Sequence, residues 1–336
     1  MAFFIDSNIR LYIEDGITVH KLSIQSDFTY NRSGRINSVN RESMDPSGDR
    51  SVIPIIDEVG PITFSFSTYA EVDDTAAIVT SAQKLLWRGL AGTANALDED
   101  TSRFLVNFGS SADIPTLNPL SIYVEYLNTG KVIKLTNATI DRVTMDMRLD
   151  SMLNMTWKGT ALGYEESSAP SVDKDYTVHS NCIITKLSTI TLLRNAVNYN
   201  LALTGGRVEI NNNNVYYTRN QFARSKTTIG HYTGARQIQG SLDFYTKTGT
   251  NASYDLYDAI MTDAITDTTT DYSYDLETIA DIQITIGDAS GYNIQLELPE
   301  TILNLPTQRY RNTVTMSVPF LVKESTGKEF QVKYNI

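Results

Sequence analysis

Cysteine and histidine are scarce in this chain of 336 residues, which contains one Cys and three His. A single cysteine, Cys182, excludes an intramolecular disulfide framework and any metal site built from several cysteines. The histidines His20, His179 and His231 are dispersed and leave little material for a zinc centre. The sequence therefore predicts neither a metal site nor a cofactor site.

Basic charge is in deficit as well. The chain has 28 Lys and Arg against 39 Asp and Glu, which gives a formal net charge of -11. A protein that grips nucleic acid by neutralising phosphates needs a basic surface, so the composition argues against that class. The length suggests two domains, each large enough to bury a core.

Long apolar runs are missing. The most apolar segments, 51–56 and 76–90, are either short or interrupted by Gln83, Lys84 and Arg88, and a membrane span needs about 18 apolar residues. The N-terminal sequence MAFFIDSNIRLYIEDG has neither a basic n-region nor an apolar h-region. We expect a chain that first folds in a cytosol, without a signal peptide or a membrane span.

The common catalytic signatures are absent. The chain contains no Gly-x-Ser-x-Gly elbow, Walker loop, His-Glu-x-x-His or Gly-x-Gly-x-x-Gly. His20 lies near Asp15 and Ser23 in sequence, but a catalytic triad is defined in space and such proximity arises by chance. His231 is interpreted as a surface residue. We expect no enzyme.

Two further candidates for chemistry have simpler explanations. The segment 258–275 contains five aspartates but lacks the ligand spacing and turn glycine of an EF-hand, so we interpret it as a solvated loop. Cys182 stands at a predicted strand start and is interpreted as a small buried residue. The sequence therefore offers no catalytic, cofactor-binding or metal-binding residue.

Alternation of apolar and polar residues with a period of two dominates what is present. This pattern is typical of strands that have one buried and one solvated face, as in antiparallel sheets. Abundant Thr and Tyr favour the same structure. The alternation is clearest in residues 62–67, 122–126, 282–286 and 314–318.

Helical spacing of apolar residues is convincing in only two places. Residues 75–90 predict a helix, with Asp73 or Asp74 available as its N-cap and Gly92 just beyond its end. A shorter helix is predicted over residues 253–261, with Ser253 as its cap. One helix falls in each half of the chain.

The order of predicted elements repeats along the chain. When the sequence is slid along itself, 131–162 falls over 292–323 without a gap, and Arg148 aligns with Arg309 and Met155 with Met316. The strand at 62–69 likewise aligns with 238–245. A polar stretch of linker type lies at 165–171. We therefore expect two tandem domains, residues 1–165 and 172–336.

Each half also contains a long polar segment between its early strands, residues 31–50 and 211–236. Loops of this length are uncommon in compact domains and are usually functional or disordered. One interpretation is a pair of solvated loops; the other is a pair of equivalent arms that dock on acidic surfaces of neighbouring subunits. The basic residues of these arms are the predicted contacts: Arg32, Arg35, Arg41, Arg50, Arg219, Arg224, Lys226 and Arg236.

Two copies of a small β domain, each with one helix and one polar arm and with no active site, resemble the major tail tube proteins of tailed bacteriophages. The resemblance covers nearly the whole chain and is carried by architecture, because that family has no sharp sequence motif. It implies a mainly β (α+β) fold of two tandem β-sandwich or half-barrel tube domains, each with one short helix. It also implies rings whose sheets join into an inner barrel, with the helices outside the wall and the arms reaching the next ring.

This chain departs from the commonest pattern of that family because it holds two tube-like domains. The resemblance then implies that three copies close a pseudo-sixfold ring, a homotrimer without exposed strand edges. Implied partners are further copies of the chain and other tail proteins, namely the baseplate, tape measure, terminator and, in a contractile tail, the sheath. The implied location is the virion tail, assembled in the cytoplasm of the bacterial host.

In a tail tube, the charge of the chain would serve the passage of DNA. An acidic lumen lined by Thr, Ser and Asn would repel phosphates weakly, so that the duplex slides without specific binding. We therefore expect polar and acidic residues on the lumen wall, and no membrane insertion.

Three other functions remain open. A baseplate or tube-initiating protein would form one ring at the tail end. A carbohydrate-binding β-sandwich is suggested by 19 Tyr and by Trp87 and Trp157, although Trp87 lies on the predicted helix and Trp157 follows the core alternation of its strand. An enzyme with an unrecognised site is the third.

Overall fold

The computed structural model describes all of the chain except residues 1–8, 17, 26, 43–49, 74–78, 93–96, 100–102, 109–115, 172–179, 219–225, 267–278, 289–290, 311–312, 324–329 and 336. The protein is mainly β, with 66% strand and two α-helices in the described part. All four segments with the clearest period-two alternation lie in strands. The mainly β fold predicted from the sequence is therefore confirmed.

The first half of the chain forms seven antiparallel strands in one continuous path of pairings. The path begins at the edge strand β3 and ends at β2. In order of pairing, it runs through β3 (Thr29–Glu42), β4 (Arg50–Tyr69), β10 (Asn154–Ser167), β9 (Lys131–Arg148), β8 (Leu120–Tyr126), β1 (Ile9–Glu14) and β2 (Val19–Leu22).

The second half traces the same path. Its pairings run from β14 to β13 and are again antiparallel. The strands in order are β14 (Leu203–Asn211), β17 (Gln237–Tyr245), β21 (Val314–Val322), β19 (Asn293–Leu303), β18 (Ile279–Gly287), β12 (Thr189–Arg194) and β13 (Val197–Tyr199). Two strands complete this half: β20 (Thr307–Tyr310) pairs with β21, and β22 (Phe330–Asn335) pairs with β19.

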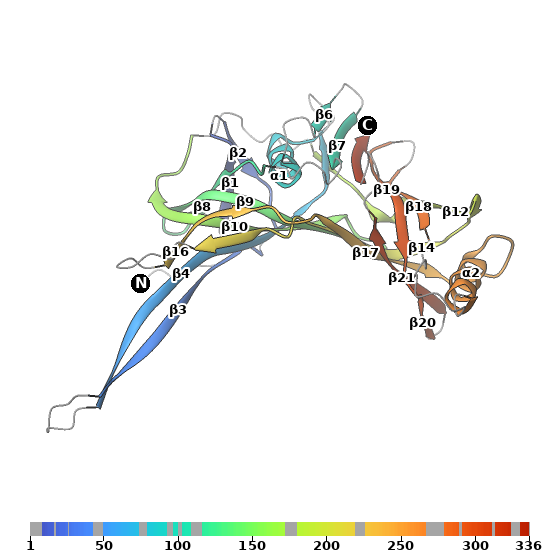
Figure 1. Ribbon diagram of the computed structural model, residues 1–336. Helices are drawn as coiled ribbons and strands as arrows, with labels where there is room; N and C mark the ends of the chain where they lie inside the picture. The colour runs from blue at the N-terminus through green and yellow to red at the C-terminus, as the bar shows by residue number, and fades with distance from the viewer. Residues whose placement is uncertain are drawn as a thin grey trace.

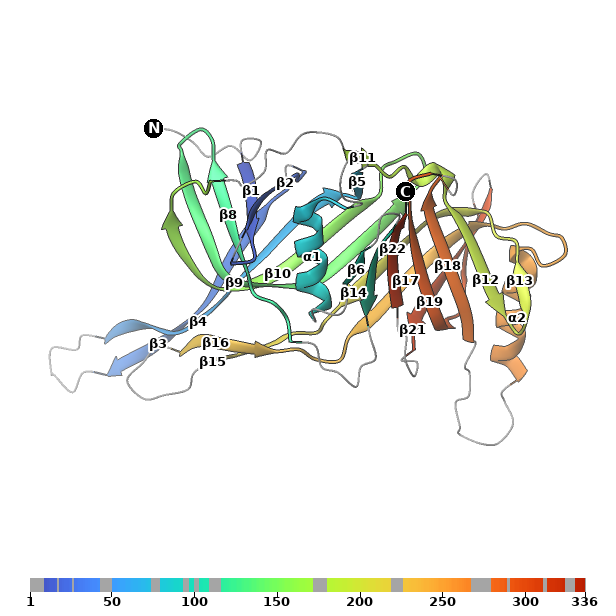
Figure 2. The same ribbon diagram turned by 90° about the horizontal axis from the view of Figure 1, so that it is seen from above.

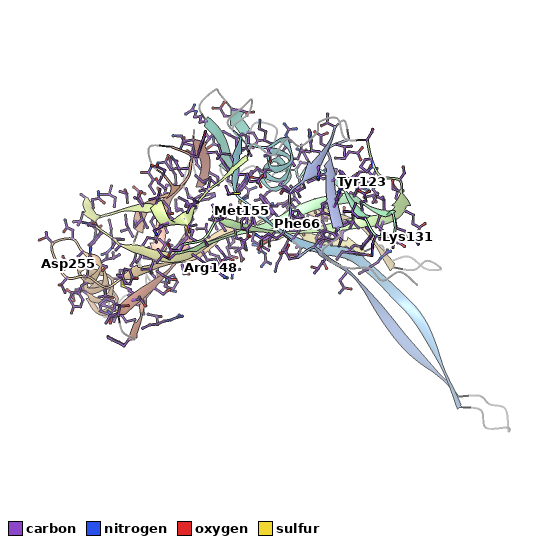
Figure 3. The ribbon with its side chains drawn as sticks, turned by 180° about the vertical axis from the view of Figure 1, so that it is seen from behind. Phe66, Tyr123, Lys131, Arg148, Met155 and Asp255 are labelled. Atoms are coloured by element: carbon purple, nitrogen blue, oxygen red, sulfur yellow. The ribbon has the colours of Figure 1, made fainter. Side chains whose placement is uncertain are left out.

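Figure 1 shows the strands from β4 through β10, β9, β14 and β17 to β21 as an arch, with α1 on its convex side and α2 beyond its far end. From behind, Tyr123 and Lys131 lie toward one end of the arch, Phe66 and Met155 toward its middle, and Asp255 at the other end (Figure 3). The two halves are therefore side by side along a single curved sheet.

The first helix, α1 (Ser81–Ala91), begins later than its apolar spacing predicts. Thr80 is its N-cap, because the Thr80 side chain accepts a hydrogen bond from the Gln83 backbone N–H. The predicted start at residue 75 is wrong because Thr80 has non-helical backbone before the helix, and Asp73 is not the cap because it ends strand β5 (Glu71–Asp73). The other predicted cap, Asp74, lies outside the described residues. Gly92 ends the helix as predicted, with φ of 90°.

The second helix, α2 (Ser253–Thr266), is longer than the predicted 253–261. Ser253 is its first residue rather than a cap: its Oγ accepts a hydrogen bond from the Lys247 backbone N–H and donates one to the Tyr245 carbonyl. The predicted acidic loop therefore begins as helix at Asp258, and residues 267–275 of that loop lie outside the described part.

An aromatic ring covers a glycine at the same place in each half, with the two partners exchanged between strands. Gly159 of β10 lies opposite Phe64 of β4, whereas Gly240 of β17 lies opposite Phe320 of β21. A Cβ would stand 2.4 Å from the Phe64 ring at Gly159 and 2.6 Å from the Phe320 ring at Gly240. Each ring occupies the space that a side chain on the glycine would need.

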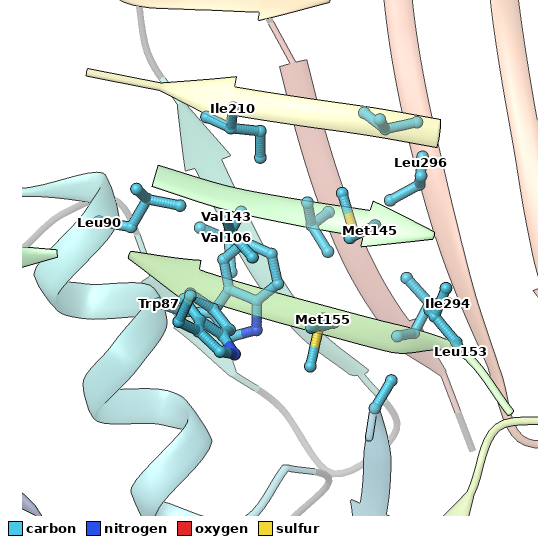
Figure 4. Close-up of a cluster of buried hydrophobic side chains, with 14 of the residues drawn as sticks. Trp87, Leu90, Val106, Val143, Met145, Leu153, Met155, Ile210, Ile294 and Leu296 are labelled. Carbon is cyan, nitrogen blue, oxygen red and sulfur yellow. The ribbon is translucent and has the colours of Figure 1, made fainter. Parts of the chain in front are cut away.

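The two halves share one sheet and one core. Strand β9 pairs with β14, and β7 (Arg103–Phe108), which pairs on its other side with β6 (Leu97–Glu99), pairs with β22. The buried apolar residues of both halves form one contiguous cluster. Side chains from α1, β9, β10, β14 and β19 meet in it (Figure 4). In the described residues, the two halves of the chain are therefore joined through one sheet and one core.

Both tryptophans belong to this core and are fully buried. The Trp87 and Trp157 rings meet edge to face at 5.1 Å. Their indole N–H groups donate to Tyr334 at 2.9 Å and to Thr68 at 3.0 Å, so each buried polar atom has a partner. Neither ring is available to stack on a sugar, which removes the tryptophan argument for a carbohydrate-binding module.

In the described residues, the greater part of each long polar segment forms paired antiparallel strands rather than loop. Strands β3 and β4 pair from Thr29 to Glu42 and project beyond the sheet as a long ribbon (Figures 1 and 2). In the second half, β15 (Val215–Thr218) pairs with β16 (Lys226–Tyr232). Strand β16 also pairs in parallel with β4, so the two hairpins of one chain lie together at the same end of the sheet (Figure 2).

A two-stranded sheet and a short 3₁₀ helix complete the fold. Strand β11 (Ser180–Cys182) pairs with β5, and the 3₁₀ helix spans Thr185–Leu187. Strand β10 extends to Ser167, so the predicted linker over residues 165–171 begins inside the sheet. This small sheet places the start of the second half beside the end of β4.

Candidate assembly surfaces

The seam between the halves is the pairing of β9 with β14. Seven residue pairs join the two strands, from Arg148 opposite Gly205 to Arg142 opposite Asn211. Glu209 stands at the seam and is 8% exposed. Its carboxylate lies 3.5 Å from Arg142 and 3.0 Å from Arg207, and it accepts a hydrogen bond from Thr144.

The second half also caps the C-terminal end of α1. The fully buried Asn212 donates from Nδ2 to the Leu90 carbonyl at 2.8 Å. Arg236 donates from Nη2 to the Ala91 carbonyl at 3.2 Å and from Nε to Asn212 Oδ1 at 2.9 Å, and its guanidinium lies over the Phe108 ring. A cation at this position also complements the negative end of the helix dipole.

A third contact joins the β15–β16 hairpin to the first half through Asp141 of β9. Its carboxylate accepts hydrogen bonds from Tyr216 at 2.8 Å, Thr160 at 2.6 Å and Thr139 at 3.1 Å, and from Asn214. Burial raises the pKa of Asp141 above its ordinary value, and these hydrogen bonds oppose the rise. Burial and the neighbouring Asp141 charge raise the pKa of the Tyr216 phenol.

The two ends of the arch are strands with one partner each. In the described residues, β3 pairs with β4 alone and β20 pairs with β21 alone. Exposed apolar side chains stand at these edges: Tyr30 on β3, Leu305 just before β20 and Tyr310 at its end. An unpaired strand edge with apolar side chains is a template for another strand.

These free edges correspond to the two strands that already meet at the seam. β14 holds the place in the second half that β3 holds in the first, since each begins the path of pairings. Under the alignment of 131–162 with 292–323, β20 corresponds to residues 146–149, at the end of β9 that pairs with β14. The chain thus ends on one side with a β3-type edge and on the other with a β9-type edge.

The concave, helix-free face of the arch is polar. On each strand its residues alternate with buried apolar ones, as Thr144 and Asp146 alternate with Val143 and Met145 on β9. Among the residues described on this face, the basic side chains are those of Arg142, Arg148, Lys158, Arg207 and Arg309, and the acidic ones are those of Asp146, Glu209 and Asp243. The negative charge of the chain is therefore not concentrated on this face.

A cavity of about 900 Å³ lies where this face approaches β20. It is lined by polar residues of the seam, including Arg207 and Glu209, and by apolar residues that include Leu303, Leu305 and Leu321. The lining combines an apolar rim at the free edge with the charged groups of the seam.

The predicted arm residues are distributed over several places. Arg32 donates from Nε to the Gly60 carbonyl at 3.3 Å, within its own hairpin. Arg236 is not on an arm at all, because it is held at the end of α1 by contacts within the chain. The others lie in the β3–β4 or β15–β16 ribbons or outside the described residues: Arg35, Arg41, Arg50 and Lys226 in strands, Arg219 and Arg224 outside.

Residues considered for catalysis or metal binding are not assembled into a site in the described part of the chain. No group of three or more His, Cys, Asp or Glu residues there could hold a metal ion. His20 Nε2 lies 3.1 Å from Thr18 Oγ1, and the His231 ring contacts Tyr216. Cys182 is half-buried, and burial raises the pKa of its thiol, which disfavours the reactive thiolate.

Neither of the two described helices has the length and apolar composition that crossing a membrane requires. The surfaces that remain unexplained by the fold of one chain are the two strand edges, the hairpins and the polar concave face.

The residues at the seam were missed by sequence reasoning. Asp141, Glu209 and Asn212 occupy positions that resemble the solvated face or end of a strand. Nothing in the local pattern distinguishes them from ordinary surface residues, because their partners come from the other half of the chain. The alignment of 131–162 with 292–323, which pairs Arg148 with Arg309, is the sequence signal that relates the end of β9 at the seam to the free strand β20.

Comparison with known proteins adds one similarity. No protein-family model matches the chain. The chain is 25% identical over 277 residues to a protein named tail tube protein pb6 from Escherichia phage T5. The match covers 74% of this chain and 59% of that relative. This similarity confirms the resemblance to bacteriophage tail tube proteins that the order of elements in the sequence implied.

Proposed function

We propose that this chain is the structural subunit of a bacteriophage tail tube, and that it closes into trimeric rings that stack around a channel for genomic DNA. The observation that carries the proposal is the correspondence between the free edges and the seam. A chain whose two ends match the two sides of its own internal joint can repeat that joint with further copies.

The repeated order of pairings supports an internal duplication, with one tube-like unit in residues 1–165 and another in residues 172–336. The exchanged Gly–Phe pairs add to this support, because the same cross-strand contact is kept in space while its residues change strands. Six such units are the number that the resemblance implies for one ring. Three copies of the chain supply them.

The seam predicts the register of the contact between copies. Thr29 corresponds to Arg207, since the first is paired with Ser65 and the second with Ser241 at equivalent positions of β4 and β17. Arg207 lies opposite Asp146, and the alignment of the two halves matches Asp146 with Thr307. Thr29 of one copy should therefore stand opposite Thr307 of the next.

The same register places Asp27 opposite Arg309, and opposite charges at facing positions stabilise an antiparallel pair. It also brings the exposed Tyr30 and Leu305 to the same interface, on opposite faces of the sheet, where the neighbouring copy would reduce the exposure of each. Closing the ring in this way pairs β3 with β20, so these two strand edges are no longer free.

Stacking is assigned to the hairpins. The β3–β4 ribbon projects beyond the sheet, and β16 pairs with its base at Glu58 and Val59. A ribbon braced in this way can reach an adjacent ring while remaining fixed to its own. The second hairpin acts as a brace for the first, which revises the sequence-based interpretation of two equivalent arms.

The concave face becomes the wall of the channel in this assembly. Its Thr, Ser and Gln side chains offer few strong phosphate contacts, as the sequence-based expectation required. The charged side chains named above for this face are five basic and three acidic, so the expected excess of acidic residues is not found among them.

Disulfide trapping tests the contact between copies. In a Cys182→Ser background, Thr29→Cys and Thr307→Cys together should form a disulfide across the interface, because directly opposite residues have Cα atoms about 4.5–5.5 Å apart. Under oxidation, denaturing electrophoresis should show covalent dimers and trimers and no larger species. A ladder that continues past the trimer would contradict the trimeric ring.

The matched control moves one cysteine by a single residue. Thr29→Cys with Gln308→Cys places the two side chains on opposite faces of the sheet and should give little cross-linking. The register would be refuted if this control pair cross-links in assembled material and the Thr29→Cys and Thr307→Cys pair does not.

A further inference from the structure

Charged side chains on the concave face gather at the seam between β9 and β14. Glu209 lies between Arg142 and Arg207, at 3.5 Å and 3.0 Å. The Glu209 side chain is 11% exposed, whereas those of Arg142 and Arg207 are 38% and 55% exposed. The carboxylate is therefore covered by the two guanidinium groups, which themselves face the concave side.

The strand register explains this arrangement. Glu209 lies opposite Thr144 of β9, and Arg142 is two residues from Thr144 on the same face. Arg207 is two residues from Glu209 on β14, and it lies opposite Asp146. Side chains at such facing and diagonal positions are within reach of one another. The two basic and two acidic groups have a total charge of zero.

The corresponding residues at the proposed contact between copies carry no charge. By the same alignments, Arg142, Thr144, Asp146, Arg207 and Glu209 correspond to Leu303, Leu305, Thr307, Thr29 and Asn31. At these five positions, the seam is neutral because its charged side chains are paired. The contact between copies is neutral there because none of its five residues is charged.

We propose that Glu209 is a charge-pairing residue that keeps Arg142 and Arg207 from binding the phosphates of duplex DNA. The proposal rests on the proposed function in assigning this face to the channel. A guanidinium presents a planar set of donors suited to phosphate oxygens, and a carboxylate that already accepts from it competes for those donors.

The effect of this pairing is multiplied by assembly. A tube presents the seam three times in every ring, so unpaired arginines would line the channel with regularly repeated phosphate-binding groups. A duplex that contacts many such groups at once is retained far more strongly than one contact would suggest. Charge pairing at Glu209 lets the wall keep its arginines at the seam without retaining DNA.

The test is the affinity of Glu209→Gln for duplex DNA. We measure fluorescence anisotropy of a labelled duplex of about 30 base pairs with the purified full-length chain, over about 50–200 mM salt. If both arginines contact phosphate, the slope of log K against log salt steepens by about 1.8, at about 0.9 per phosphate. Affinity at 0.1 M salt should rise by about tenfold or more.

Two matched variants separate charge pairing from net charge. Asp243→Asn makes the same charge change on the same face and should leave binding close to that of the native chain. Arg142→Gln and Arg207→Gln added to Glu209→Gln should abolish the gain. Equal gains from Asp243→Asn and Glu209→Gln, or no gain from a folded Glu209→Gln chain, would overturn the proposal.

If Glu209→Gln fails to fold, Asp146→Asn provides the same test, since it removes the partner opposite Arg207 and should steepen the slope by about 0.9. Electron microscopy of the same preparations reports on the tube independently. A variant that gains DNA affinity in a chain that forms no tubes supports the charge pairing and counts against the proposed function. A Glu209→Gln chain that forms tubes but gains no affinity for DNA supports the proposed function and counts against the charge pairing.

Discussion

Removing the Asn212 side chain is the perturbation that most directly probes how the two halves are joined. Asn212→Ala deletes the hydrogen bond to the Leu90 carbonyl and the acceptor of the Arg236 Nε–H group. The bond to Leu90 joins the two halves, the bond to Arg236 holds a side chain that also caps α1, and Asn212 is fully buried. The variant should therefore weaken the whole structure rather than one half.

The magnitude follows from the contacts. A buried carbonyl that loses its partner costs about 1–3 kcal/mol, and the weakened Arg236 contact adds about 1 kcal/mol, since Arg236 is only half-buried and keeps its bond to Ala91. The expected loss is about 2–4 kcal/mol. With an unfolding entropy of about 2.1 cal/mol/K per residue, this corresponds to a fall in Tm of about 3–6 °C.

Differential scanning calorimetry and urea unfolding measure this loss. Because the core is contiguous, we expect one transition that shifts as a unit. Arg236→Ala should cost less, and a double-mutant cycle of the two should give a coupling energy of about 0.5–1.5 kcal/mol. Asn198→Ala, on an exposed position of β13, is the control and should change stability by less than about 0.5 kcal/mol.

Two results would refute the reasoning. An Asn212→Ala chain within about 0.5 kcal/mol of the native chain would mean that the cap on α1 does not hold the halves together. Two separated transitions, with only one shifted, would mean that the halves unfold as independent domains in spite of their common core.

The sheet, the buried carboxylate and the hairpins each carry a further prediction. Gly240→Ala should destabilise the chain by about 1–3 kcal/mol in urea unfolding, because its Cβ would meet the Phe320 ring and the Arg207 carbonyl; an unchanged midpoint would contradict the packing. Burial raises the pKa of Asp141 in the folded state, so the folded chain binds a proton more readily than the unfolded chain, and stability should rise as the pH falls from 7 toward the ordinary Asp pKa of about 4. Urea midpoints of Asp141→Asn should lack this increment, and parallel pH profiles for the two chains would refute it. Replacing residues 38–54 by Asn-Gly, which shortens the β3–β4 ribbon in register, should leave single rings but abolish stacking; tubes of normal length in electron micrographs would remove the ribbon from the mechanism.

The fold class was predictable from the sequence because period-two alternation is a local signal. The burial of Trp157 followed from the same alternation, and the order of elements was enough to suggest two equivalent halves. These features depend on which face of a strand meets the core. They do not require any knowledge of which strands pair.

The hairpins were not predictable in this way. Residues 31–42 contain few apolar side chains, of which Ile36 and Val39 are examples, so no alternation marks them as a strand. Their order comes from backbone pairing with β4, which amino-acid patterns do not display. The start of α1 was missed for a related reason. Asp73, Asp74 and Thr80 are all acceptable N-cap residues, but Asp73 belongs to strand β5 and the cap is Thr80.

The seam lay outside the reach of sequence patterns because its partners are distant in the chain. Asn212 and Leu90 are 122 residues apart, and Arg236 and Ala91 are 145 apart. The Gly–Phe exchange could not be predicted either, because the alignment of the two halves places Gly159 over Phe320, two unlike residues. Only the strand register shows that these mismatches build the same contact twice.

Electron microscopy of the purified chain, with rotational averaging of end-on views, tests the central claim most directly. The account predicts hollow tubes of stacked rings, each made of three chains, with threefold symmetry and six similar wall segments around the channel. Single rings that never stack would favour a tube-initiating role. Monomers under assembly conditions, or rings built from a number of chains other than three, would contradict the account.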